Sequence, residues 1–118
     1  MRETFFKQGT RVDAASFMAH YKSIANVNDP NKTERDAAHA AMRLLNYYEF
    51  LSMGMIRGDL NEDMLRHTIG TIMCNFVADF ADVIAFVRNE SVVKPASSFV
   101  HLREIYNRWK PPHRPIIT

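Results

Sequence analysis

The sequence predicts a single all-α domain, built as a four-helix bundle with a central helical hairpin. Apolar residues recur at intervals of three and four over long segments, the spacing that places them on one face of an α-helix. Five prolines and four glycines fall mostly between these segments or near the chain ends, which favours long helices over many short strands. With 118 residues, 47% of them apolar and 24% charged, the chain suits one domain with one core.

The first helix is expected to follow the Gly9-Thr10 turn, which leaves residues 1–10 as an N-terminal arm. Thr10 or Asp13 serves as its cap, because a side-chain oxygen there accepts a hydrogen bond from the first turn. The run NVNDPN at 26–31 ends the helix, since the residue before Pro30 is driven out of the helical region. Its expected buried face consists of Phe17, Met18, Tyr21, Ile24 and Ala25.

A long second helix is expected to begin near Thr33, where Glu34 and Asp36 provide an acidic first turn that complements the helix dipole. Gly54 and Gly58 are expected to stop it. Its early alanines allow close approach of a neighbouring helix. The apolar face consists of Ala37, Ala38, Ala41, Leu44, Leu45, Tyr48 and Leu51.

A short connection then leads into a third helix, from about residue 61 to 89, which packs against the second as a tight hairpin. Asn61 or Asp59 caps it. At 1.5 Å per residue this helix is about 40 Å long against a domain diameter of about 35 Å, so it bends near Gly70 or one end protrudes. The expected stripe is Leu65, Ile69, Ile72, Phe76, Phe80, Val83 and Val87, widened by Met64, Met73, Val77 and Ile84.

The last helix follows a linker around Pro95, with Ser97 or Ser98 as its cap, and covers the hairpin together with the first helix. It carries Phe99, Leu102, Ile105, Tyr106 and Trp109. Three prolines then make residues 111–118 a Pro-rich tail, expected to be extended and mobile.

Charge is distributed unevenly, although the formal net charge is only +2. Residues 59–87 are acidic, with Arg66 as their one basic side chain, whereas residues 88–118 are basic. The first interpretation is that the two segments neutralise each other within the fold. The other is that the basic third forms an electrostatic surface for a partner.

The segment LLNYYEFL at 44–51, followed by Gly54, Arg57-Gly58-Asp59 and NEDML at 61–65, carries a family resemblance. It resembles a family of uncharacterised bacterial and prophage proteins known only as a domain of unknown function. Members share an asparagine, aromatic, glutamate pattern at a helix end before a glycine-arginine-glycine turn, which here reads MGMIRGD. The helix 99–109 is similar to the family's closing helix, so the resemblance covers about residues 33–110.

The resemblance implies a helical fold, a bacterial or phage origin and no assigned reaction. Anchored members carry an N-terminal membrane helix that this sequence lacks, and no stretch approaches the 18 to 20 apolar residues of a membrane span. A single cysteine, Cys74, forms no disulfide within the chain and fits a reducing compartment. We therefore expect a cytoplasmic protein of a bacterial host, without membrane contact.

No motif points to catalysis, to a cofactor or to a metal. The nearest pairs of potential metal ligands, Asp63 with His67 and His101 with Glu104, each offer two groups where zinc takes three or four. Cys74 lies in an apolar helix, where an inert structural thiol is the usual outcome. The sequence therefore predicts that the protein is not an enzyme.

Glu49 and Arg57 stand near the end of the second helix, where the pair either orients a ligand or pins the turn. Pinning the turn is the favoured interpretation.

The sequence favours a protein-interaction module, for example a phage or prophage product that binds and modulates a host protein. The exposed contact is assigned either to the turn 53–58 or to the basic last helix and the tail. A nucleic-acid-binding regulator is the alternative, because cations alternate with aromatic rings in the last helix. Six of the seven methionines offer adaptable apolar surface, so a homodimer is a further alternative; they are Met18, Met42, Met53, Met55, Met64 and Met73. The partner-binding candidates are Met55, Arg57, Arg103, Arg108, Trp109 and Lys110.

Overall fold

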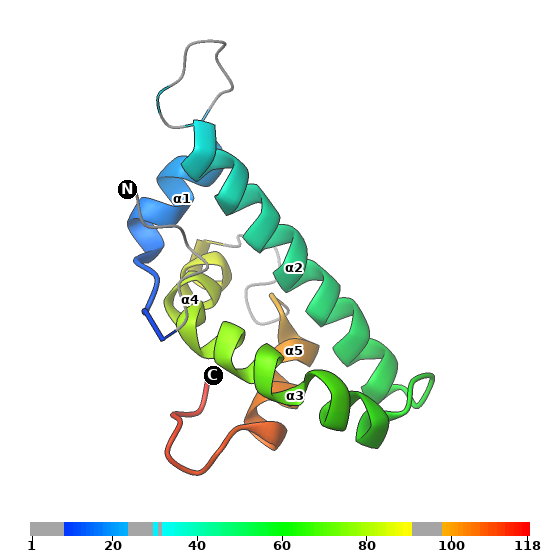
Figure 1. The fold of residues 1–118 in the computed structure, drawn as a ribbon. Helices are drawn as coiled ribbons and strands as arrows, with labels where there is room; N and C mark the ends of the chain where they lie inside the picture. Colours follow the sequence, from blue (N-terminus) through cyan, green and yellow to red (C-terminus); the bar gives the residue numbers. More distant parts are fainter. Residues whose placement is uncertain (1–8, 24–29, 31, 91–97) are drawn as a thin grey trace.

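The computed structural model describes residues 9–23, 30, 32–90 and 98–118, and these ranges contain five α-helices and no β-strand (Figure 1). The predicted all-α single domain is confirmed. Residues 1–8 of the arm, Ile24, Ala25, and the linker around Pro95 with Ser97 lie outside the described residues. The helices are α1 (Ala14–Lys22), α2 (Lys32–Ile56), α3 (Glu62–Asp79), α4 (Ala81–Glu90) and α5 (Val100–Trp109).

Two predicted N-terminal caps are confirmed. The carboxylate of Asp13 accepts a hydrogen bond from the backbone N–H of Ser16 at 2.9 Å, and so caps α1. The side chain of Asn61 accepts from the N–H of Met64 at 3.0 Å, and so caps α3. In both cases a short polar side chain satisfies a donor that the first helical turn leaves free.

The expected third helix is two helices, because the chain breaks at Phe80 and α3 and α4 are bent by 61°. The bend does not lie near Gly70, which is inside α3. At the break the carbonyl of Asp79 accepts a hydrogen bond from the N–H of Val12 at 2.9 Å. The segment before α1 therefore supplies a donor to a carbonyl at the C-terminal end of α3. Phe80 itself is buried.

The bend at Phe80 brings aromatic rings from neighbouring helices into contact. The Phe80 ring stacks on Phe76 of α3 at a centroid distance of 4.4 Å and meets Phe17 of α1 edge-on at 5.5 Å. Phe76 in turn meets Tyr48 of α2 at 5.8 Å. Such pairs contribute about 0.5–1.5 kcal/mol each beyond their buried area. The bend therefore joins three helices through one run of rings.

Helices α2 and α3 open like a V from the turn that connects them, and α5 packs against both (Figure 1). Helix α1 packs against α2 and α4 at the far end of the V. The expected hairpin is thus connected by a short turn but is not tight, because α5 stands between its arms.

The open V changes which side of α3 is buried. Ile72, expected in the core, is 62% exposed, and Met64 is 58% exposed. Leu65, Ile69 and Phe76 are only partly buried. The buried positions of α3 are Gly70, Met73, Cys74, Val77 and Ala78, the side that α5 and the neighbouring elements cover.

The Pro-rich tail folds back onto the body. The N–H of Ile117 donates to Oδ1 of Asn107 at 2.9 Å, and Nδ2 of Asn107 donates to the carbonyl of Ile117 at 2.7 Å. Ile117 is buried, and Arg88 of α4 donates to the last residue, Thr118. The tail therefore does not extend away from the body, because one asparagine side chain satisfies both backbone groups of Ile117 and holds its apolar side chain in the core.

Candidate functional site

The turn between α2 and α3 has the hydrogen bonds of a Schellman motif. The N–H of Gly58 donates to the carbonyl of Met55 at 3.1 Å, and the N–H of Asp59 donates to the carbonyl of Gly54 at 2.8 Å. Gly58 has φ +82°, a conformation that a residue with a Cβ rarely adopts. This glycine ends α2, and Gly54 does not, because α2 continues through it to Ile56.

Gly54 has a different role, which is to admit the side chain of Leu60. A Cβ at Gly54 would lie 2.7 Å from Cδ1 of Leu60, closer than real contacts allow. The N–H of Leu60 also donates to the Gly54 carbonyl at 3.1 Å. The absence of a side chain at position 54 thus allows the turn to fold back against α2.

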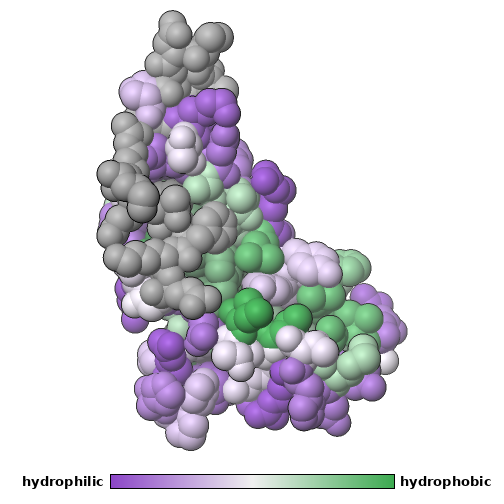
Figure 2. Space-filling view, viewed as in Figure 1, coloured by the Kyte–Doolittle hydropathy of each residue, from purple (hydrophilic) through white to green (hydrophobic). Residues whose placement is uncertain are grey.

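An apolar groove of about 280 Å³ lies at this corner of the molecule. Its apolar lining comes from Phe50, Met53 and Leu60, and the charged side chains of Arg57 and Asp59 complete it. Phe50 is 61% exposed, although a phenylalanine gains about 1.5–3 kcal/mol when it is fully buried. Figure 2 shows that hydrophobic side chains gather around the lower part of α2 and along α3 on the face drawn.

One exposed face of α2 extends the groove along the helix. Arg43, Tyr47 and Phe50 follow one another at spacings of four and three residues, which place them on one side of α2, and Arg57, the first residue after the helix, stands seven positions beyond Phe50. Tyr47 is 55% exposed. In the part of the chain that the structure describes, neither Arg43 nor Arg57 forms an ion pair. We call these four residues the α2 face.

The structure separates the six predicted partner-binding residues. Arg57 lies on the α2 face and is exposed, whereas Met55 is buried and does not line the groove. Of the two candidates near the turn, only Arg57 is therefore a surface residue. The exposed apolar side chains beside it are Phe50 and Leu60, which the apolar periodicity did not single out.

The four candidates in the last helix have internal partners or limited exposure. Trp109 is buried and its indole N–H donates to Glu62 of α3 at 3.1 Å. Arg108 pairs with Glu62 and with Glu104. Lys110 is partly exposed, and Arg103, also partly exposed, donates from Nε to the carbonyl of Ser98 at 3.0 Å.

The link from Arg108 to Glu62 joins the basic third to the acidic segment, as mutual neutralisation within the fold requires. Burial lowers the pKa of Arg103, and the nearby Arg88 lowers it further.

Glu49 serves α5 and not the turn. Its Oε1 accepts from the N–H of Leu102 at 2.8 Å, and its Oε2 accepts from Nδ1 of His101 at 2.5 Å. The first turn of α5 follows Phe99, whose φ of +52° and apolar side chain provide no cap of its own. A carboxylate from α2 supplies the missing cap, so the expected pairing of Glu49 with Arg57 is wrong, as is the expected serine cap.

The histidines of the two pairs of potential metal ligands are held by hydrogen bonds within the protein. Nδ1 of His67 donates to the backbone carbonyl of Asp63 at 2.7 Å, and His101 is held by Glu49. Within the described ranges no three histidine, cysteine or acidic side chains come together in a way that could hold an ion. Of the six methionines considered for an interface, Met53 is partly exposed and Met64 is exposed, while Met18, Met42, Met55 and Met73 are buried.

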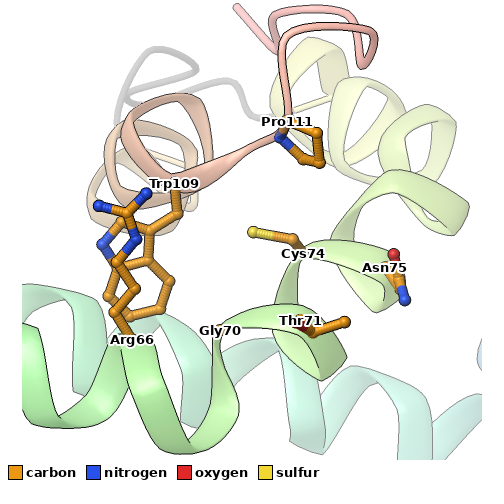
Figure 3. A pocket seen from close by; sticks show the side chains of 7 residues that line it. All are labelled: Arg66, Gly70, Thr71, Cys74, Asn75, Trp109 and Pro111. Atoms are coloured by element: carbon orange, nitrogen blue, oxygen red, sulfur yellow. The ribbon is translucent and has the colours of Figure 1, made fainter.

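A second cavity, of about 250 Å³, lies between α3 and the end of α5 (Figure 3). Arg66 stands beside the indole of Trp109, and the side chain of Cys74 is directed into the space between Trp109 and Pro111. Gly70, Thr71 and Asn75 complete the lining. We call this cavity the Trp109 pocket.

Glycine at position 70 shapes the Trp109 pocket. A Cβ there would lie 3.4 Å from Cγ of Arg66 and 3.9 Å from Cε3 of Trp109, which are ordinary contact distances. Gly70 is thus not required by a clash, and a Cβ there would occupy space on the floor of the pocket, in contact with Arg66 and Trp109.

Among the described residues, no single helix is long and apolar enough to cross a membrane. Only α3 and α4 taken together reach that length and composition, across their 61° bend.

The chain belongs to the family described as domain of unknown function DUF4760, which matches residues 2–109. The match extends beyond the resemblance read at residues 33–110 to include α1 and most of the arm. No curated protein and no solved structure matches the chain.

Proposed function

We propose that this protein acts by binding another protein through the α2 face and the adjoining apolar groove. The observation that carries the proposal is the exposure of Tyr47 and Phe50 side by side above a groove lined by Met53 and Leu60. Exposed aromatic side chains beside a concave apolar surface are typical of the energetic centre of a protein interface.

The charges on this surface favour a partner with acidic groups. Arg43 and Arg57 flank the two rings, and no ion pair within the described residues occupies either of them. Arginines at the rim of an apolar patch contribute to orientation and to the rate of association. The bacterial and prophage origin implied by the resemblance makes a cytoplasmic host protein the partner that we propose.

The alternative of nucleic-acid binding through the last helix has less support. Tyr106 is fully buried and Trp109 is 6% exposed with its indole N–H donated to Glu62, so neither ring presents an open face on which successive bases could stack, and Arg108 is held by two carboxylates. A homodimer through the α2 face remains a second outcome of the same experiment, because both possibilities use the same exposed rings.

A photo-crosslinking amino acid at position 50 tests the proposal. The matched control carries the same group at position 116 in the C-terminal tail, where Ile116 is 66% exposed and is not part of the α2 face. We expect a discrete protein adduct from position 50 in a bacterial host, insensitive to nuclease and reduced at least about tenfold by Tyr47→Asp, since a buried aromatic anchor is worth about 2 kcal/mol or more.

Equal adducts from positions 50 and 116 would contradict the proposal. An adduct that disappears with nuclease would favour nucleic acid, and an adduct of twice the chain mass would identify the partner as a second copy.

A further inference from the structure

A separate site, independent of the α2 face, is formed where α5 ends against α3. The Trp109 pocket has a volume of about 250 Å³. A cavity of roughly 150 Å³ is large enough to hold benzene, and typical ligand sites begin at about 300 Å³. The pocket is therefore the right size for a single ring with one small substituent.

The side of the pocket between Trp109 and Pro111 favours a flat apolar group. Trp109 lines the space with the small part of its indole that remains exposed and Pro111 with a saturated ring, and Gly70 and Cys74 form the floor between them (Figure 3). Aromatic rings pack well against an indole in offset or edge-on arrangements. The polar side chains of Thr71 and Asn75 lie on the other side of the pocket from Trp109.

The charge at the pocket favours an anion. Arg66 lines it, is exposed, and has no ion-pair partner within the described ranges. Glu62, one helical turn before Arg66, is occupied by Arg108 and by the indole N–H of Trp109. The pocket therefore offers an available guanidinium, which binds a carboxylate through two parallel hydrogen bonds.

The thiol of Cys74, on the floor of the pocket, adds no negative charge that would repel an anion. Burial raises the pKa of Cys74, while Arg66 and Arg114 act in the opposite direction, so the thiol stays protonated at neutral pH in a positive potential. A protonated thiol beside a ring behaves as a small apolar group.

We propose that the Trp109 pocket binds a small single-ring aromatic carboxylate, with its ring against Trp109 and its carboxylate at Arg66. The chain offers two built-in reporters of this binding, because Trp109 is its one tryptophan and Cys74 its one cysteine, and both line the pocket.

The test uses the full chain with benzoate as the probe and benzyl alcohol as the uncharged match of the same ring. We expect a saturable change in Trp109 fluorescence with benzoate, and at least about tenfold weaker binding of benzyl alcohol, the effect of losing one charge-assisted contact. Benzoate should also slow the reaction of Cys74 with an uncharged maleimide over the same concentration range.

Two substitutions and one control sharpen the test. Arg66→Gln should weaken benzoate about tenfold and leave benzyl alcohol unchanged, whereas Arg43→Gln, at an exposed arginine on α2, should change neither. Gly70→Ala places a methyl group on the floor and should weaken both compounds. Because alanine stabilises helices relative to glycine, this variant should melt no lower than the parent, which separates a filled pocket from a damaged fold.

Fluorescence that does not saturate with benzoate would overturn the proposal. Equal binding of benzoate and benzyl alcohol, or equal effects of Arg66→Gln and Arg43→Gln, would overturn it as well, since the carboxylate would then not be at Arg66.

Discussion

Helices α2 and α5 both carry aromatic rings and arginines close together in sequence, yet the fold treats them oppositely. On α2, Tyr47 and Phe50 are exposed and the arginines beside them lack acidic partners in the described residues. On α5, Trp109 is buried and Arg108 is paired with Glu62. The residue types are alike, and the difference is whether another helix supplies apolar cover and a carboxylate. Chemistry of this kind indicates a binding surface only where the fold leaves it uncovered.

The largest expected difference in unfolding free energy comes from replacing one aromatic side chain on each helix. Trp109→Ala removes a buried side chain and leaves Glu62 without the indole donor, so it should lower the free energy of unfolding by about 3 kcal/mol or more. Phe50→Ala, on the exposed face, should change it by less than about 0.5 kcal/mol. Urea denaturation followed by circular dichroism measures both. Similar losses would show that Phe50 is a core residue and not part of a free surface.

A second test concerns the carboxylate that attaches α5 to α2. Glu49→Ala removes the acceptor for the N–H of Leu102 and for His101, and should cost about 1–2 kcal/mol of unfolding free energy, as the loss of a helix cap does. Glu104→Ala is the matched control, because Glu104 is exposed and forms an (i, i+4) pair with Arg108 worth only about 0.3–0.5 kcal/mol. If the two variants lose equal stability in the same denaturation experiment, Glu49 does not act as the cap.

A third test examines the buried side of α2. Ser52 is fully buried and its hydroxyl has no hydrogen-bond partner among the described residues. Ser52→Ala removes an unsatisfied polar group and should raise the free energy of unfolding by about 1 kcal/mol. Calorimetry should record a higher melting temperature. A lower melting temperature would indicate that the hydroxyl has a partner in solution.

The smallest expected effect distinguishes the two kinds of arginine. Arg108→Gln breaks a partly exposed contact with Glu62 and should cost about 0.5–1 kcal/mol at low salt, with the loss shrinking as salt is added. Arg57→Gln should leave stability unchanged at any salt concentration. A comparable, salt-dependent loss at Arg57 would mean that this arginine has an internal partner, and it would weaken the assignment of the α2 face.

The sequence pattern was most informative where one helix face meets one neighbour. All five expected core residues of the last helix are buried, namely Phe99, Leu102, Ile105, Tyr106 and Trp109. The same reasoning was misleading for α3, because apolar spacing identifies a face and not what covers it. Ile72 and Met64 fit the stripe, yet the V between α2 and α3 leaves them exposed.

The candidate sites were harder to foresee. The turn after α2 and the residue Arg57 could be singled out from glycine and charge patterns, but Phe50 looked like one more helical aromatic. The Trp109 pocket joins Arg66 and Cys74 of α3 to Trp109 and Pro111, which lie 35 to 45 positions later in the chain. Periodicity within a helix carries no information about such a meeting of distant segments.

The sequence by itself determined the helical class, narrowed the caps of α1 and α3 to two candidates each, which include Asp13 and Asn61, and placed a turn at Gly58, because these depend on neighbours within a few residues. Only the tertiary structure decided the break at Phe80, the capping of α5 by Glu49, the return of the tail onto Asn107, and which aromatic rings remain exposed. Each of these depends on partners many residues away. Their energies arise from packing and hydrogen bonds that exist only after the helices have come together.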